Sequence, residues 1–251
     1  MREFHTFKFR NRNLMELGAV ISQRPKRVSA VKDVEFVPIP HHNGDAFVDN
    51  KRYKNIAFEI PIRAVPHYCG LTFKQFSDQL IEWLRPAPYE DYRDTYNPGY
   101  FRLASVQEVK EIVAVKHDVY ETSIVFNFMP FLYRDSGQFP ITKFTDDANS
   151  ITMELHNPEQ WESDPIIKLI GSGQFYITVN GKNIAATVDE EITIDKKTEN
   201  VYDKNGDPCN QRISGLRIPQ LEVGDNTIQV TRADATEGRI TLQVIPNWGR
   251  L

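Results

Sequence analysis

The sequence lacks any long hydrophobic run. Its longest apolar stretches are as short as IIKLI at residues 166–170, whereas a helix that crosses a membrane needs about 20 apolar residues. We therefore expect no insertion into a membrane. Residues 1–13 carry charge without an apolar segment, so we expect no secretory signal and predict synthesis in the cytoplasm.

Cysteine is also scarce. Cys69 and Cys209 are the two cysteines of the chain, and their wide separation gives neither a Cys-x-x-Cys pair nor a disulfide framework. This pattern fits a reducing compartment. We predict that each cysteine is a small packed side chain rather than a reactive thiol.

Motifs of catalysis are missing as well. The sequence has no Gly-x-Ser-x-Gly motif for acyl transfer and no Gly-x-x-x-x-Gly-Lys loop for binding phosphate. Two acidic pairs, Asp146–Asp147 and Glu190–Glu191, could supply the two carboxylates of a glycoside hydrolase, but a solvated turn explains both. We predict no catalytic residue, no bound cofactor and no enzymatic activity.

Charge is moderate and uneven. The formal net charge is −4, with 25% charged and 40% hydrophobic residues, as in ordinary globular proteins. Residues 1–27 are locally basic, but they do not make the broad basic face of a nucleic-acid-binding protein. We therefore expect no specific recognition of DNA or RNA.

The first half of the sequence alternates apolar and polar residues in short runs. This pattern predicts strands over residues 4–9, 31–39 and 55–65. A loop or hairpin is predicted over residues 40–53, where Asn, Gly, Asp and Pro are frequent. Long strands are expected again between residues 100 and 133.

One helix is predicted, beginning at Thr72 and ending before Pro86. Thr72 and Gln75 have the spacing of a capping box, and the residue before a proline avoids helical conformation. Apolar residues at helical spacing should face the core. They are Phe73, Phe76, Leu80, Ile81 and Leu84.

The second half predicts strands and turns only. The Asn-Gly of VNGK at residues 179–182 is a strong hairpin signal, and closely spaced strands without a helix favour a β-sandwich. Apolar periodicity lapses at 133–150. We therefore predict a mainly β protein with a sandwich-type N-terminal domain carrying one helix (1–135) and a C-terminal β-sandwich domain (136–251).

Two sets of residues resemble metal ligands. The run ITIDKKTENVYDKNGD (192–207) is rich in acidic residues, but its glycine falls at the wrong position for a calcium loop, so an exposed turn is predicted. The second set is His41, His42, His67 and Cys69, whose spacing is poor for zinc. We predict no metal site.

Aromatic residues of the second half offer a further possibility, because exposed rings can stack on a sugar. Trp161, Phe175, Tyr176 and Trp248 are the candidates, although aromatic side chains in a small sandwich usually lie in its core. Trp161, in the polar stretch NPEQWESDP, is the least core-like. It is our candidate sugar-stacking residue.

The order of these landmarks resembles the distal tail protein (Dit) family of long-tailed, non-contractile bacteriophages. In the first half, VEFVPIPHHNGD, NKRYKNIAFEIPI, the single helix, NPGYFRLASV and IVFNFMPFLY follow the family's order. The second half adds DPIIKLIGSGQFYITVNGK, ITIDKKTENVYDKNGD, LEVGDNTI and VIPNWGRL. The sequence departs from the family at Asn247, where arginine is common, and at His41 and His42, where Gly-Arg is usual.

This resemblance implies a structural role in the virion, at the phage tail tip or baseplate. N-terminal domains of the family associate into a hexameric ring, and the C-terminal domain is galectin-like or carbohydrate-module-like in fold. The implied partners are further copies of the chain, the tail tube protein, the tail-associated hub or fibre protein and the tape-measure protein. DNA would cross the lumen without specific binding. The alternative is a carbohydrate-binding module that contacts the host cell wall.

Two physical features are compatible with such a ring. Small β domains have unpaired edge strands, which pair readily with another chain, and a closed ring uses those edges. Arg24, Lys26 and Arg27 flank Pro25 and could contact a neighbouring subunit. An ordinary solvated loop explains them equally well.

Overall fold

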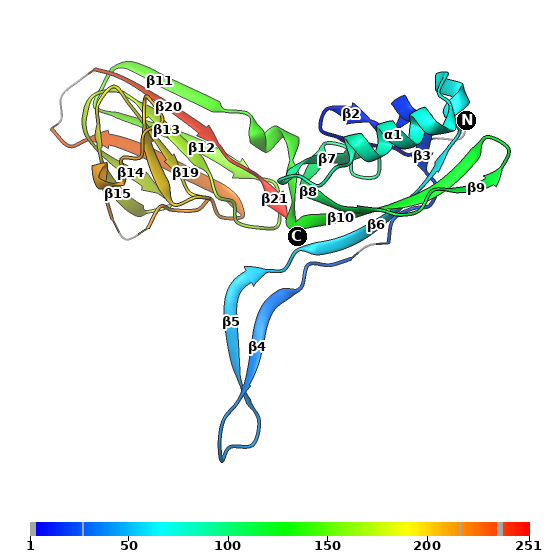
Figure 1. The fold of residues 1–251 in the computed structure, drawn as a ribbon. Helices are drawn as coiled ribbons and strands as arrows, with labels where there is room; N and C mark the ends of the chain where they lie inside the picture. Colours follow the sequence, from blue (N-terminus) through cyan, green and yellow to red (C-terminus); the bar gives the residue numbers. More distant parts are fainter. Residues whose placement is uncertain (1–3, 27, 216, 235–237) are drawn as a thin grey trace. The chain divides into compact units, whose positions relative to one another are not determined.

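The computed structural model describes residues 4–26, 28–215, 217–234 and 238–251 (Figure 1). The chain divides into two compact units, unit 1 ending at Leu132 and unit 2 spanning Tyr133–Arg250. This division lies close to the domain boundary that we predict between residues 135 and 136. That the two units are the two predicted domains, 1–135 and 136–251, stays a prediction.

The described residues are mainly in β-strands, with one α-helix, which confirms the predicted fold class. Unit 1 contains one large antiparallel sheet with the strand order β2-β1-β7-β8-β10-β6-β3, and β9 also pairs with β10. The strands are β1 (Phe7–Phe9), β2 (Arg12–Asn13), β3 (Ala19–Ile21), β6 (Ile56–Ala64), β7 (Glu90–Asp94), β8 (Tyr100–Val109), β9 (Val113–Lys116) and β10 (Val119–Arg134).

The helix of unit 1, α1 (Phe73–Trp83), begins as its sequence predicts. Thr72 accepts a hydrogen bond from the backbone of Gln75, whose side chain in turn accepts one from the backbone of Thr72. The predicted apolar stripe is partly wrong, because Phe73 and Ile81 are exposed. Trp83 takes a buried place instead, and its indole donates to the Phe9 carbonyl at 3.0 Å.

Aromatic rings make up much of the core of unit 1. Phe7 and Tyr92 stack at 5.3 Å, and Phe126 meets Tyr92 edge-on at 5.1 Å between ring centroids. Phe76 and Leu80 of α1 belong to the same buried cluster. The helix is therefore held on the sheet by apolar contact. Two 3-10 turns, η1 (Leu14–Leu17) and η2 (Pro66–Cys69), complete the unit's helical segments.

A separate hairpin also belongs to unit 1. Strands β4 (Lys32–Pro38) and β5 (Asp45–Tyr53) form a two-stranded antiparallel sheet of their own, and residues 39–44 form its loop (Figure 1). This arrangement confirms the hairpin predicted near residues 40–53.

Unit 2 is a β-sandwich. Its two antiparallel sheets have the strand orders β11-β20-β13-β16-β17 and β12-β19-β14-β15-β18. The strands are β11 (Ile141–Ala148), β12 (Ser150–Asn157), β13 (Ile166–Ile170), β14 (Gly173–Val179), β15 (Lys182–Val188), β16 (Glu191–Asp195), β17 (Asn200–Asp203), β18 (Ile213–Ser214), β19 (Gly224–Arg232) and β20 (Gly238–Ile245). The terminal strand β21 (Gly249–Arg250) belongs to neither sheet. Two 3-10 turns, η3 (Asp135–Gln138) and η4 (Asn210–Arg212), join them.

The core of this sandwich follows the alternation of its strands. Every second residue of β14 is buried, including Phe175 and Ile177, and the buried residues of both sheets form one cluster. The predicted Asn-Gly hairpin joins β14 to β15, with Asn180 at φ 49° and Gly181 at φ 81°. Positive φ at both loop residues is the signature of the two-residue turn that VNGK predicts.

The two ends of unit 2 are bound to each other. The backbone N–H of Arg134 donates to the carbonyl of Trp248 at 2.9 Å, and that of Asn247 donates to the carbonyl of Gly137 at 2.8 Å. Trp248 is buried in the sandwich core. A β-carbon on Gly137 would lie 2.5 Å from the backbone nitrogen of Trp248, so only glycine fits there.

No helix among the described residues is both long enough and apolar enough to cross a membrane.

Candidate functional site

The β4–β5 hairpin exposes apolar side chains on both of its faces. Phe36 pairs with Phe47 across the two strands, and their rings meet edge-on at 5.7 Å, yet they are 65% and 59% exposed. Val37 and Val48 are also exposed, on the opposite face because side chains alternate along a strand. Both faces of the hairpin are thus apolar surface that no described residue covers.

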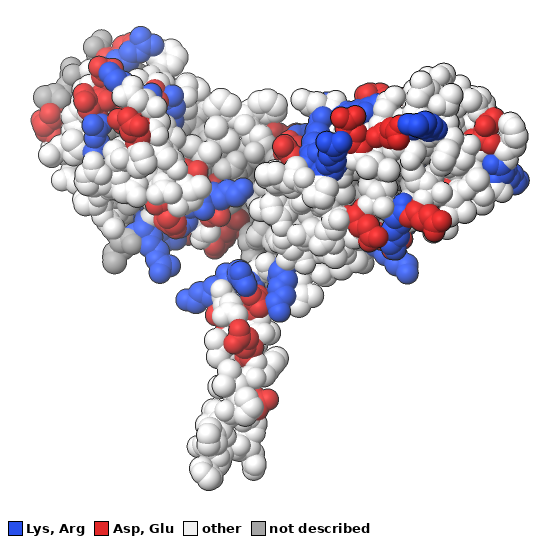
Figure 2. Space-filling view, in the orientation of Figure 1, with Lys and Arg blue, Asp and Glu red and all other residues white. Residues whose placement is uncertain are grey.

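Ion pairs stabilise the base of this hairpin, where β4 begins and β5 ends, which we call its root. Asp33 is 5% exposed. Its carboxylate accepts a hydrogen bond from the guanidinium of Arg52 at 2.7 Å and forms an ion pair with the ammonium group of Lys54 at 3.2 Å. The Arg52 hydrogen bond, followed by that of Lys54, lowers the pKa of the Asp33 carboxyl. Lys32 and Asp49 pair at 2.7 Å nearby. Figure 2 shows Lys and Arg side chains gathered at this root and mostly uncharged atoms toward the hairpin tip.

The tip carries two of the residues that resemble zinc ligands, His41 and His42, and both are exposed. The other two lie in η2. The Sγ of Cys69 donates to the Met15 carbonyl at 3.4 Å, and Nδ1 of His67 lies 3.8 Å from a carboxylate oxygen of Asp118. Within the described ranges, no group of three or more His, Cys, Asp and Glu side chains is placed to hold a metal ion.

The candidate subunit-contact residues lie in the segment between β3 and β4. Arg24 and Lys26 are exposed, and the guanidinium of Arg24 lies 5.7 Å from the centre of the Tyr96 ring. Arg27 lies outside the described residues. The role of this basic segment in subunit contact stays a prediction.

The acidic run of residues 192–207 forms β16, β17 and two turns, as the turn interpretation predicts. The carboxylate of Asp203 accepts hydrogen bonds from the backbone N–H groups of Asn205 at 2.8 Å and Asp207 at 3.0 Å. These bonds lower the pKa of Asp203. The carboxylate therefore closes a turn of its own chain, with Gly206 at positive φ.

Three residues of the acidic pairs, Asp146, Glu190 and Glu191, lie beside cations. Glu190 pairs with Lys204 and Glu191 with Lys168, each at 2.7 Å. The carboxylate of Asp146 lies 3.7 Å from the guanidinium of Arg239.

Trp161 lies between β12 and β13 and is 37% exposed. Its carbonyl accepts a hydrogen bond from the Asn157 amide at 2.8 Å. Glu159, two residues earlier, is buried and pairs with Arg134 at 3.3 Å. Of the four aromatic candidates, Phe175 and Trp248 are buried, whereas Tyr176 is 51% exposed. Tyr176 therefore presents more of its side chain to solvent than Trp161 does.

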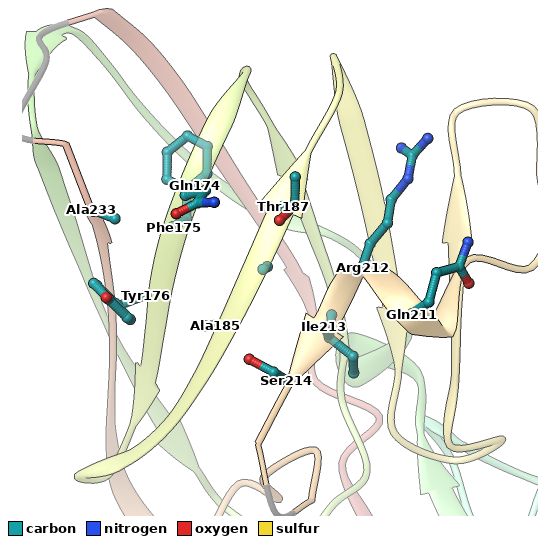
Figure 3. A pocket seen from close by; sticks show the side chains of 11 residues that line it. Gln174, Phe175, Tyr176, Ala185, Thr187, Gln211, Arg212, Ile213, Ser214 and Ala233 are labelled. Carbon is teal, nitrogen blue, oxygen red and sulfur yellow. The ribbon is translucent and has the colours of Figure 1, made fainter.

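Tyr176 borders a hollow of about 190 Å³ on the outer face of its sheet. Figure 3 shows the side chains that line it, contributed by the neighbouring strands β14 and β15, by the η4–β18 segment and by Ala233, which follows β19. No pattern in the sequence predicts this hollow, because its lining residues come from strands that only the fold brings together. The alternation in QFYITV, which buries Phe175 and turns Tyr176 outward, was a signal that could have found the ring.

These observations describe a mainly β protein of two units. Unit 1 carries the exposed apolar hairpin β4–β5, and unit 2 carries the hollow beside Tyr176. The fold of the chain is that of the SPP1 phage Dit protein (gp 19.1), described as a paradigm of the hub adsorption apparatus in phages that infect Gram-positive bacteria. The TM-score is 0.71 at 12% identity, over 99% of this chain and 100% of that one. The phage p2 baseplate in its activated conformation also matches, with strontium (TM-score 0.43, 7% identity, 96% and 98% coverage) and with calcium (0.41, 6%, 96% and 98%).

No protein-family model and no curated protein sequence matches the chain. The likeness to the SPP1 protein is therefore one of fold.

Proposed function

We propose that this chain is a structural component of a phage tail tip, a hub that assembles from six copies into a ring. The likeness in fold to the SPP1 Dit protein, over nearly the whole of both chains, supports this role. The hub would connect the tail tube to the tail-associated hub or fibre protein and leave a channel for DNA. It would act as part of the virion and without catalysis.

The observation that carries the proposal is the β4–β5 hairpin. A two-stranded hairpin alone is marginally stable in water, and this one exposes Phe36, Phe47, Val37 and Val48. Exposed apolar surface of this kind marks an interaction site. A copy of the same chain is the partner that we assign to it, because a head-to-tail contact repeated around a closed ring covers the same surface in every copy.

Size-exclusion chromatography with light scattering tests this assembly. The expected particle has six times the chain mass of 29.0 kDa, and negative-stain images should show an annulus. The double variant Phe36→Ser, Phe47→Ser should shift the mass toward that of the monomer. A folded wild-type protein that stays monomeric at every concentration, both alone and with the tail tube protein, would overturn the proposal.

Phe144→Ser is the matched control for this experiment. Phe144 lies on β11 of unit 2 and is 60% exposed, as much as Phe47 at 59%. Its removal should leave the assembled mass unchanged. Equal loss of assembly in both variants would show that general surface hydrophobicity, rather than the hairpin, drives association.

A further inference from the structure

The outer face of the β12-β19-β14-β15-β18 sheet has one large aromatic ring beside a row of small side chains. The registers place Tyr176 opposite Ala185, and Ala185 opposite Ser214, in one row across three strands. A large residue followed by two small ones leaves a step in the surface. The hollow of about 190 Å³ lies at this step, with Ala185 and Ser214 among its lining residues.

Polar groups surround this step. Gln174 and Thr187 pair across β14 and β15 in the neighbouring row of the same face, and Arg212 is the last residue of η4, directly before β18 (Figure 3). Among the described residues, the side chains of Gln174, Thr187 and Ser214 make no hydrogen bond within the chain. An amide and two hydroxyls are therefore available to a ligand, together with the guanidinium of Arg212.

The core beneath this face is complete without a ligand. Phe175, Ile177 and Ala186, from the same strands, point inward and are buried in the sandwich. Ile213 packs against that cluster as well. The outward residues are thus not needed to close the core, and Tyr176 keeps half of its surface in solvent although the sandwich is full.

We propose that this step binds carbohydrate, with one pyranose ring stacked on Tyr176 above Ala185. A pyranose has an apolar face of C–H groups that suits an aromatic ring and a rim of hydroxyls that suits amide, hydroxyl and guanidinium groups. The hollow is smaller than the roughly 300–1,000 Å³ of pockets that enclose drug-sized ligands, so it takes a single ring of a longer glycan. Arg212 gives a preference for a sugar that carries an anionic substituent.

A glycan array tests the proposal, using the purified full chain on neutral, amino, uronic and phosphorylated oligosaccharides. Positive members are then titrated by saturation-transfer NMR, which detects binding in the millimolar range. Tyr176→Ala should weaken binding at least about ten-fold, which corresponds to about 1.4 kcal/mol. Tyr176→Phe, which keeps the ring, should bind within about two-fold of wild type.

Two further variants separate the step from other surfaces. Ala185→Leu fills the hollow without removing any polar group and should also weaken binding at least about ten-fold. Trp161→Ala should leave binding unchanged. Absence of binding to every array member overturns the proposal, as does binding that survives both Tyr176→Ala and Ala185→Leu. Loss of binding in Trp161→Ala alone would move the sugar site to Trp161 and overturn it too.

Ring assembly and sugar binding are read out separately. The carbohydrate site lies within unit 2 and does not depend on the proposed ring. A monomer that binds sugar, or a hexamer that does not, tells the two proposals apart.

Discussion

Two hairpins of the molecule, β14–β15 and β4–β5, differ in what covers them. The β14–β15 hairpin lies inside a five-stranded sheet, and alternate residues such as Ile177 and Val179 are fully buried against the opposite sheet. The β4–β5 hairpin has a comparable local pattern of Val and Phe, but both of its faces are exposed. An apolar strand is stable when a second layer covers it. The β14–β15 hairpin has that layer in the opposite sheet, whereas among the described residues none covers the Phe and Val side chains of β4–β5.

The largest expected effect is the removal of a buried side chain from the covered hairpin. Ile177→Ala should lower the free energy of unfolding of unit 2 by about 2–5 kcal/mol, because it leaves a cavity in a full core. Val37→Ala in the exposed hairpin should change the stability of the monomer by less than about 0.5 kcal/mol. Urea denaturation followed by fluorescence measures both, and equal losses would contradict the comparison.

A smaller effect is expected at the turns of the two hairpins. Gly181 and Gly44 both have positive φ, 81° and 93°, and a β-carbon on either would meet open space. Gly181→Ala should destabilise unit 2 by about 1–2 kcal/mol, because an L-residue is strained in this conformation and the turn sets the register of a core hairpin.

Gly44→Ala is the matched change in the exposed hairpin. It should leave the unfolding of unit 1 within about 0.5 kcal/mol of wild type, because the hairpin contributes nothing to the core. Thermal and urea unfolding of both variants give the comparison. A larger loss for Gly44→Ala than for Gly181→Ala would show that the exposed hairpin is integral to the folding of unit 1.

The smallest effect concerns pH and the root of the exposed hairpin. Hydrogen bonds from Arg52 and Lys54 lower the pKa of Asp33 in the folded protein. A lowered carboxyl pKa stabilises the fold above the unfolded-state value, about 3.9 for aspartate, and this contribution is lost as pH falls through the folded-state value. Acid should therefore loosen the hairpin root once the pH falls through the lowered pKa of Asp33.

Hydrogen exchange of residues 32–53, corrected for the intrinsic rate at each pH, measures this loosening. Asp33→Asn should show at neutral pH the reduced protection that the wild type shows in acid, once the pH has fallen through the lowered pKa of Asp33. Asp146→Asn, at an exposed and longer ion pair in unit 2, is the control and should not alter the hairpin. An acid response that is unchanged in Asp33→Asn would assign it to another group.

Features set by neighbouring residues could be predicted from the sequence. The capping box of Thr72 and Gln75 and the Asn-Gly turn at residues 180–181 both form as expected, because each depends on contacts within a few residues. The acidic run forms turns for the same reason, since the Asp203 carboxylate reaches backbone N–H groups two and four residues later. Short-range hydrogen bonding decided these three features.

Features set by distant residues could not be predicted. The buried face of α1 is rotated from the expected stripe, because Trp83 reaches the carbonyl of Phe9, which is far away in sequence. The exposure of Phe36 and Phe47 also could not be foreseen, since VEFVPI has the composition of a half-buried strand. The hollow beside Tyr176 forms because Ala185 lies opposite Tyr176 and Ser214 lies opposite Ala185. Only the register of the sheet, which the sequence does not reveal, places these residues in one row.

The bonds between the two ends of unit 2 have a mechanical consequence. Arg134 and Gly137 are tied to Trp248 and Asn247, so the chain enters and leaves the sandwich at one place. If the last residues of the chain and the strand that leads into unit 2 were pulled apart, these two backbone hydrogen bonds would bear the force first. The two sheets of the sandwich would not be extended. In an assembly that transmits pulling forces through its subunits, these hydrogen bonds would therefore break while the rest of the sandwich stays folded.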